Sequence, residues 1–456
     1  MEDKREEKTS LVASEGKGGI DENQGNIEFA TTQKGVNAQT IDNMILALTL
    51  DDELAKTLAH NQFTDRIVIQ KNVPWNRDGR TDNFDDIDLS NICWILEKQY
   101  GLSSEKKILT AIQIVADANR FHPIHDILES LEWDGRDRIA ELFPKYLGAE
   151  RCDYTTEITK NWLMGAINRV YHPGCKYDTM LVLIDVDGGG GKSSLARFLA
   201  INDDFFTDDV KDFDDGRIVE KLAGHWIIEM GEMQAVANAK SIESLKAFLS
   251  RQKDIYRVPY GRFSKDYPRQ CVFIGTSNDT QFLPQDSSGY RRFMPLRVDK
   301  TKAEIHPLAD VNETREFVAQ LWAQAMAIYN KGDYSLELDD SIRNQLESVV
   351  NEYAPEDTKF LSVKNWLDSN RDIKKVCTSM IYEKALKNDD YKKARQWELK
   401  EITQIMNRMP GWVLHPTKSH QVRFDIYGPM RAWDRVPKDK LPKPILEDSD
   451  DEEIPF

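Results

Sequence analysis

The spacing of apolar positions first distinguishes a helical N-terminal part. The stretch SSEKKILTAIQIVADANRF begins at serines that suit a helix cap, and its apolar residues recur at helical intervals. The next stretch, HPIHDILESLEWDGRDRIAELF, has a turn at Asp134–Gly135. We therefore expect a helical N-terminal domain over residues 36–150.

Residues 151–310 change from helical spacing to short continuous apolar runs. The runs are MLVLI (180–184), WIIEM (226–230) and CVFIG (271–275), with helical patterns between them. Strands that alternate with helices predict a buried, largely parallel sheet, and so an α/β fold. A helical extension is expected over 311–370, where one helix face carries Val318, Leu321, Trp322, Ala325, Met326 and Tyr329.

Residues 371–440 predict a small winged-helix-like module. An apolar helix face in WELKEITQIMNRM ends at Pro410-Gly411, and the strands GWVLH and QVRFDIYG follow around a loop. Residues 375–440 hold fourteen Lys or Arg against eight Asp or Glu, a net charge of +6. A helix followed by a basic wing is typical of a duplex DNA reader, with Lys418 and Arg423 as candidate contacts. A structural lid of unrelated function is the alternative.

Charge and composition exclude some classes of protein. The formal net charge of the 456 residues is -16, so the chain is not a uniformly basic DNA-coating protein, and its 40% hydrophobic fraction excludes global disorder. Residues 1–35 are expected to form a disordered arm, and 441–456 an acidic tail. No membrane span or signal peptide is expected, and five scattered cysteines suggest a reducing cytoplasm.

The sharpest chemical signal is a glycine run between an apolar strand and a helix. Such a loop turns its backbone N–H groups toward phosphate oxygens, at the positive end of the helix. We expect ATP to bind here, with Lys192 reaching the β- and γ-phosphates and the Ser193 hydroxyl ligating Mg²⁺. Val186 stands where the full pattern has glycine, and a plain strand-to-helix turn is the alternative. The expected nucleotide contacts are Gly188, Gly189, Gly190, Gly191, Lys192, Ser193 and Ser194.

Polar residues end the next two apolar runs. An ATPase needs a carboxylate near Mg²⁺ and a group that orients the attacking water. We assign Glu229 to the metal neighbourhood and Glu232 to the water, although these acids could merely end a strand. Asn278, after the third run, is a candidate sensor of the γ-phosphate.

Two basic segments complete the candidate site. Arg291 and Arg292 follow a turn, and an arginine supplied by a neighbouring subunit stabilises transition-state charge in many ATPases. A surface arginine pair is the alternative. The stretch RQKDIYRVPYGRFSKDYPRQ mixes basic and aromatic residues, which suits single-stranded nucleic acid. A hairpin here would carry Arg257, Arg262 and Lys265, unless the stretch is an ordinary solvated loop.

Together these motifs resemble the virulence-associated E family, phage- and island-encoded ATPases similar to superfamily 3 helicases. The matching stretches run from HPIHDILESLEWDG through PGCKYDTMLVLI, GGGGKSS, WIIEMGE, LKAFLSRQKDIYRVPYGR and PRQCVFIGTSN to GYRRFMPL. The resemblance implies an AAA+-type P-loop core that assembles into a homo-oligomeric ring, with Arg291 or Arg292 acting across the interface. It also implies a link to mobile-element DNA replication. In the family pattern Lys176 and Asp178 precede the core strand.

The last residues resemble the acidic tip of bacterial single-stranded-DNA-binding protein. Six acids lie within 447–453, and the chain ends in Ile454, Pro455 and Phe456. An aromatic plug behind acids that steer toward a basic pocket suits docking on host replication proteins. A tail that only improves solubility is the alternative.

The sequence therefore predicts a Mg²⁺-dependent ATPase acting on DNA, as a replication initiator or helicase of a phage or pathogenicity island. The first alternative is an ATP-switched DNA-binding regulator without unwinding activity, and a small-molecule P-loop kinase is another. A primase is disfavoured. Asp85, Asp86 and Asp88 form an acidic cluster, but nothing near it in the sequence completes a polymerase site, and a solvated turn accounts for it.

Overall fold

The structure, a computed structural model, divides the chain into two compact units, Met1–Ala354 and Pro355–Phe456, which are described separately. It describes residues 27–185, 187–210, 218–231, 239–256, 264–279, 290–353, 358–388, 390–417 and 419–436. The predicted extension over 311–370 is thus shared between the two units, since α11 and α12 belong to the first and α13 to the second.

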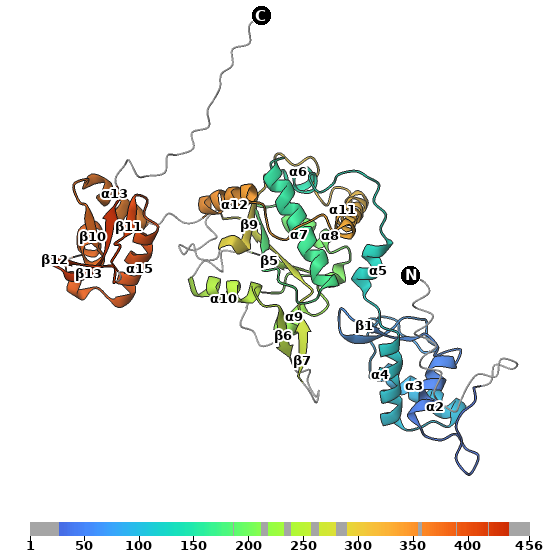
Figure 1. Ribbon diagram of the computed structural model, residues 1–456. Coiled ribbons are helices and arrows are strands. Elements are labelled where there is room, and N and C mark those ends of the chain that lie inside the picture. Colours follow the sequence, from blue (N-terminus) through green and yellow to red (C-terminus); the bar gives the residue numbers. More distant parts are fainter. Residues whose placement is uncertain are drawn as a thin grey trace, which may run out of the picture. The chain divides into compact units, whose positions relative to one another are not determined.

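The first unit begins with a small helical domain that also contains a two-stranded antiparallel sheet (Figure 1). Helix α4 buries Ile108, Ala111, Ile112 and Val115 at helical spacing, and this face packs against α2. The elements are α2 (Ile41–Leu50), β1 (Leu58–Asn61), β2 (Arg66–Ile69), α3 (Asp86–Tyr100), α4 (Glu105–Ala118) and α5 (Pro123–Ser130).

Residues 27–35, which the sequence placed in a disordered arm, are held against this domain. The Phe29 ring lies 5.1 Å from that of Tyr100. The buried side chain of Asn43 accepts a hydrogen bond from the Ala30 amide and donates one to the Ala30 carbonyl. One buried amide side chain therefore orders a segment that has no apolar periodicity of its own.

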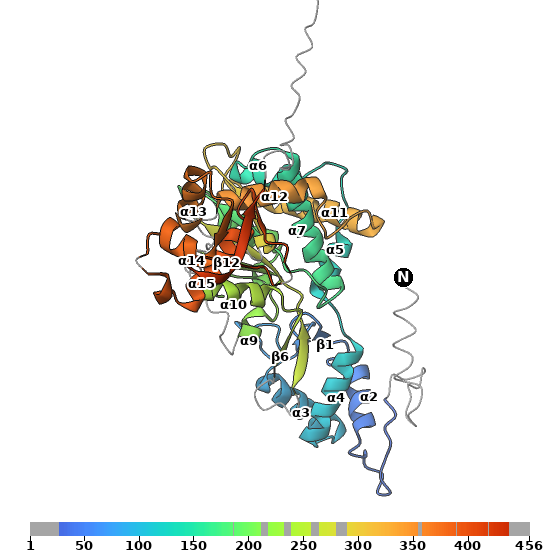
Figure 2. The same ribbon diagram turned by 60° about the vertical axis from the view of Figure 1, so that its left-hand side comes forward.

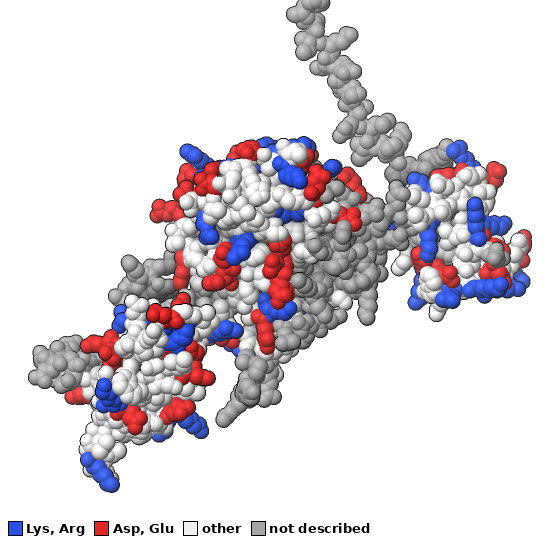
Figure 3. Space-filling model, turned by 180° about the vertical axis from the view of Figure 1, so that it is seen from behind, with Lys and Arg blue, Asp and Glu red and all other residues white. Residues whose placement is uncertain are grey.

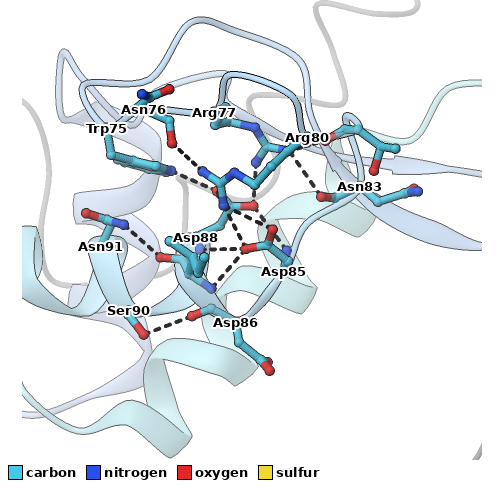
Figure 4. Close-up of polar contacts among 12 residues, drawn as sticks. Trp75, Asn76, Arg77, Arg80, Asn83, Asp85, Asp86, Asp88, Ser90 and Asn91 are labelled. Atoms are coloured by element: carbon cyan, nitrogen blue, oxygen red, sulfur yellow. Dashed lines mark hydrogen bonds and ion pairs between the residues drawn. The ribbon is translucent and has the colours of Figure 1, made fainter.

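The acidic cluster at the start of α3 has a structural role (Figure 4). Asp85 caps the helix, accepting from the backbone N–H groups of Ile87 and Asp88. Asp88 is fully buried, where it accepts from Trp75 Nε1 at 2.7 Å and pairs with Arg77. Arg80 lies 3.0 Å from Asp85 and 3.6 Å from Asp88, so the cluster is a helix cap held by ion pairs to two arginines rather than the solvated turn expected from the sequence.

The rest of the first unit is built around a five-stranded parallel sheet, so the predicted α/β class is confirmed. The strand order is β4-β5-β8-β3-β9, and β3 lies between β8 and β9. The strands are β3 (Met180–Ile184), β4 (Phe206–Thr207), β5 (Ile227–Met230), β8 (Val272–Ser277) and β9 (Phe293–Arg297).

Helices bury the sheet, and buried tryptophans fix them in place. In α7 the Trp162 indole donates to the carbonyl of Phe273 in β8, and in α11 the Trp322 indole donates to the carbonyl of Leu199. Both side chains are fully buried with satisfied N–H groups, so they fix the helices as well as filling the core. The other elements of this part are α6 (Leu142–Leu147), α7 (Asp153–Tyr171), α8 (Lys192–Leu199), η1 (Asp203–Phe205), α9 (Ile218–Leu222), α10 (Ala239–Leu249), β6 (Lys253–Tyr256), β7 (Lys265–Pro268), η3 (Tyr290–Arg292), α11 (Val311–Lys331) and α12 (Asp340–Glu352).

The second unit is a small helical domain with an antiparallel sheet. Its strand order is β10-β13-β11. β12 forms a hairpin with the first half of β13, residues 428–431. The stretch QVRFDIYG is therefore not the single strand that the sequence predicted, because a turn at residues 425–427 separates β12 from β13. The elements are α13 (Thr358–Ser369), β10 (Lys375–Cys377), α14 (Thr378–Met380), η4 (Ile381–Ala385), η5 (Tyr391–Lys393), α15 (Gln396–Asn407), β11 (Trp412–Leu414), β12 (Gln421–Phe424) and β13 (Gly428–Arg435).

None of the helices in the described ranges is long and apolar enough to cross a membrane. All five cysteines are free thiols.

Candidate active site

The glycine run forms the turn between β3 and α8. Gly188, Gly189 and Gly191 have φ angles of 65°, 71° and 85°, which side-chain-bearing residues rarely adopt. Helix α8 begins at Lys192 without a side-chain cap, which leaves its first backbone N–H groups available. Val186 lies outside the described residues. The glycines therefore give this turn a left-handed backbone that few other residues could adopt.

Lys192 is held beneath this loop between two polar side chains. Its Nζ donates to Asn278 Oδ1 at 2.8 Å and lies 3.7 Å from Asp185 Oδ2. Burial lowers the pKa of the Lys192 ammonium, and the Asp185 carboxylate acts in the opposite direction. Lys192 and Asn278, 86 residues apart in the sequence, thus meet at one point.

Glu229 joins the loop to the neighbouring strands. This carboxylate, only 2% exposed, accepts hydrogen bonds at Oε1 from Ser193 Oγ at 2.6 Å and Thr276 Oγ1 at 2.8 Å. Thr276 lies in β8, two residues before the proposed sensor Asn278. From the sequence, Thr276 was assigned no role of its own. Glu232 lies outside the described residues.

The parallel sheet explains why these side chains meet. β8 lies between β3 and β5, and all three strands point the same way, so the segments that follow them emerge at one edge. Lys192, Ser193, Glu229 and Asn278 are together at this edge. Ser194 is half-buried in the first turn of α8.

The residues at this edge suit a magnesium ion bound together with phosphates. No group of three or more His, Cys, Asp or Glu side chains among the described residues is placed to hold a metal ion. Mg²⁺ generally takes one or two protein ligands and completes its shell with waters and substrate phosphates. The Ser193 hydroxyl and the Glu229 carboxylate, in mutual hydrogen-bond contact, are oxygen donors of that kind.

The two candidate arginines are in different environments. Arg292 Nε lies 3.3 Å from Asp178 Oδ2 and donates to Ser250 Oγ at 3.0 Å, and its side chain is 18% exposed. Arg291 has a side chain that is 70% exposed and lies 3.9 Å from the same Asp178 oxygen. Arg292 is therefore fixed within its own subunit, whereas Arg291 extends from the surface.

The expected hairpin is present, but its described cations are paired. β6 and β7 are antiparallel and project from the sheet (Figures 1 and 2). Lys265 contacts both carboxylate oxygens of Asp65, at 2.5 and 2.6 Å, and Lys253 pairs with Asp266. Arg257 and Arg262 lie outside the described residues.

The predicted DNA contacts of the second unit lie on the β12–β13 hairpin. Arg423 is exposed on β12, and the exposed Arg431 pairs with Gln421 two positions away in the ladder, so the two arginines share a face. Seen from behind, the surface of this unit carries many Lys and Arg side chains beside a few acids (Figure 3). Lys418 and the tail residues Ile454, Pro455 and Phe456 lie outside the described residues.

Comparison with known proteins yields a family and weaker structural likenesses. The family model of the virulence-associated protein E-like domain matches residues 128–355. The A-form apo structure of the NrS-1 C-terminal region has 14% identity and a TM-score of 0.47, covering 83% of this chain and 96% of that one. A structure of the same region, CTR(305-718), has 13% identity with the same coverage and TM-score. A search of curated proteins finds no match.

Proposed function

The chain belongs to the virulence-associated protein E-like family, and from that premise we propose that it is a Mg²⁺-dependent ATPase that acts on DNA. The observation that carries the proposal is the meeting of Lys192, Ser193, Glu229 and Asn278 at one edge of the parallel sheet. A phosphate loop, a buried acid and a polar sensor are the parts that phosphoryl transfer from ATP requires.

Each side chain then has a defined task. Lys192 leaves Asn278 to contact the β- and γ-phosphates, and the loop N–H groups bind the remaining phosphate oxygens. Ser193 and Glu229 would hold Mg²⁺, which when bound neutralises phosphate charge. Asn278 and Glu232 orient the attacking water, and Glu232 takes its proton.

The biological setting we propose is replication of a phage or pathogenicity island, as an initiator or helicase. We propose a homo-oligomeric ring in which Arg291, rather than Arg292, reaches the nucleotide of the next subunit. The exposure of Arg291 and the two contacts of Arg292 support this choice. Light scattering with ATP and DNA should give a multiple of the subunit mass, and a monomer would exclude the ring.

DNA would contact two places. The basic and aromatic sequence between β6 and β7, which contains Arg257 and Arg262, suits single strands, and the second unit suits duplex DNA. In that unit the order β10-β13-β11 with a protruding β12–β13 hairpin, after α15, supports a winged-helix assignment. The Ile-Pro-Phe tail is proposed to dock on host replication proteins.

The Lys192→Ala variant tests the proposed activity. Removing the ammonium should abolish ATP turnover while leaving the circular-dichroism spectrum and the melting temperature near those of the wild type. The exposed Lys302 is a matched control, and Lys302→Ala should turn over ATP normally. Wild-type turnover by Lys192→Ala would exclude the assigned site.

One observation favours the regulator as a second candidate. Lys265 and Lys253, the described cations of the hairpin strands, are both neutralised by aspartates, so the hairpin strands offer little free charge to DNA. Under this alternative ATP would drive assembly without unwinding. A strand-displacement assay separates the two, since a regulator would bind DNA and leave the duplex intact.

A further inference from the structure

The segment after β9, residues 299–308, lies along one side of the phosphate loop. β9 pairs in parallel with β3, and the Val298 amide extends that pairing by donating to the Ile184 carbonyl at 2.9 Å. The chain beyond each strand therefore emerges next to the other. Lys300 Nζ donates to the Gly188 carbonyl at 2.9 Å, which links the 299–308 segment directly to the loop.

One glycine of the loop lies tightly against this segment. A Cβ atom on Gly191 would lie 2.8 Å from Pro307 Cδ and 2.9 Å from His306 Nε2, both shorter than ordinary Cβ contacts. A Cβ atom on Gly190 would lie 3.4 Å from Lys300 Cβ, an ordinary van der Waals contact. The loop and the 299–308 segment therefore form one surface, on which Lys300 and His306 are both exposed.

The 299–308 segment is fixed at both ends. The Asp299 amide donates to the Leu147 carbonyl at 2.9 Å, which anchors its start to α6. At its end the Thr314 hydroxyl of α11 donates to the Pro307 carbonyl at 2.9 Å, and Pro307 is buried. Side chains on a segment held in this way are positioned for binding without further ordering.

His306 presents a hydrogen-bond donor to the loop. Its Nδ1 accepts from the Leu308 amide at 3.2 Å, so the neutral ring carries its proton on Nε2. Nε2 faces Gly191 and has no hydrogen-bond partner among the described residues. The Nε2–H group of His306 therefore lies beside Gly191, the last residue of the loop before α8.

Lys300 adds a second positive charge to the same surface. Burial is the main cause that lowers the pKa of Lys192. The carboxylates of Asp185 and Glu229 raise this pKa, and the charge of Lys300 lowers it, so Lys300 is near enough for the two ammonium groups to act on each other. A ligand with several negative charges at that loop would be attracted by both ammonium groups.

We propose that Lys300 and His306 form a second wall of the nucleotide site, selective for a polyphosphate. Lys300 neutralises phosphate charge from the outer side of the loop, and the His306 Nε2–H group donates to an oxygen of the nucleotide beside Gly191. This assignment rests on the proposed function, because it names further contacts of the same ATP.

Equilibrium binding of ATP, ADP and AMP by the full-length chain tests the part of Lys300. Lys300→Gln should weaken ATP binding about five-fold and AMP binding less than two-fold, because the lost attraction scales with ligand charge. Lys302→Gln removes the same charge two positions away, from a side chain that is 74% exposed, and should bind all three like the wild type. Equal losses for ATP and AMP would overturn the charge role of Lys300.

Two substitutions separate the donor of His306 from its bulk. His306→Gln keeps an N–H group at nearly the same distance from the backbone and should retain affinity for ATP. His306→Leu keeps an apolar side chain without a donor and should lose affinity about five-fold, as expected for one hydrogen bond. Equal affinity of the two variants would overturn the assignment of His306.

The same titrations distinguish this inference from the proposed function. If the wild type binds no ATP, or binds it as weakly as Lys192→Ala does, the proposed nucleotide site fails and this inference fails with it. If Lys192→Ala alone loses affinity while Lys300→Gln and His306→Leu bind like the wild type, the nucleotide site stands and the second wall does not.

Discussion

At the residue scale, Asp185 is a buried carboxylate directly beneath the phosphate loop. It is 3% exposed, and its Oδ2 atom has no hydrogen-bond partner among the described residues while it lies 3.7 Å from Lys192 Nζ. Its charge opposes the effect of burial on the pKa of Lys192. We infer that Asp185 keeps this lysine protonated, and therefore able to bind phosphate.

The Asp185→Asn variant tests this role through pH. Without the carboxylate the pKa of Lys192 should fall further, so the lysine loses its proton at lower pH. ATP affinity should then drop more steeply between pH 7 and pH 9 than in the wild type, by up to about ten-fold for each unit by which the pH exceeds the new pKa. The exposed Asp187 provides the control Asp187→Asn. Parallel pH profiles for Asp185→Asn and the wild type would contradict the role.

Sequence reasoning could predict some of these residues and not others. The proximity of Lys192, Ser193, Glu229 and Asn278 was predictable because they lie at or after the ends of apolar runs, and parallel strands end at one edge of the sheet. Asp185 and Lys300 were not, because their importance comes from contacts with the loop that only the folded chain creates.

At the element scale, the β1–β2 turn contacts the β6–β7 hairpin through Asp65 and Lys265. Phe63 in this turn is buried, with its ring 5.6 Å from that of Phe205 in the sheet domain. Asp65 has a φ angle of 56°, unusual for a residue with a side chain, and directs its carboxylate at Lys265. The turn therefore places a carboxylate on the ammonium group that we propose for DNA.

Asp65→Asn should release Lys265 and increase affinity for single-stranded DNA. An exposed ion pair of this kind contributes about 0.5–1 kcal/mol, so we expect a two- to five-fold gain, measured by fluorescence anisotropy at low salt. Asp86→Asn removes the same charge from an exposed position of the same domain and should leave the affinity unchanged. Unchanged or weaker binding by Asp65→Asn would show that the contact does not compete with DNA.

The elements themselves show where periodicity fails as a guide. The antiparallel pairing of β6 with β7 was predictable from the proline and glycine in the sequence between them, because these residues mark turns. The turn that splits QVRFDIYG was missed because strand-forming residues flank it, although Asp425 and Gly428, whose φ angle is 72°, suit the two ends of a turn. Likewise, 27–35 lacks apolar periodicity, and its order depends on one distant side chain, Asn43.

At the scale of the whole molecule, charge is divided between parts with different proposed partners. The net charge of -16 coexists with a basic 375–440 segment, and six of the acids lie within 447–453. A basic module for DNA and an acidic end for proteins are compatible because each attracts its own partner.

Deleting Phe456 tests the proposed use of the acidic end. The loss should weaken binding to host proteins that recognise the tip of single-stranded-DNA-binding protein by about ten-fold or more, since a buried aromatic anchor contributes at least that much. Surface plasmon resonance against such a protein measures it, and ATP turnover should not change. Unchanged affinity would leave the tail with a solubilising role only.

The account depends most on Glu229 belonging to the same site as the phosphate loop. The most direct measurement is ATP binding and turnover by Glu229→Gln, whose amide oxygen can still accept from Ser193 and Thr276. We predict ATP binding like the wild type, because the loop and Lys192 still contact the phosphates, and turnover lowered at least about 100-fold, because a carboxylate assigned to the Mg²⁺ ion is lost. Wild-type turnover by Glu229→Gln would contradict the account.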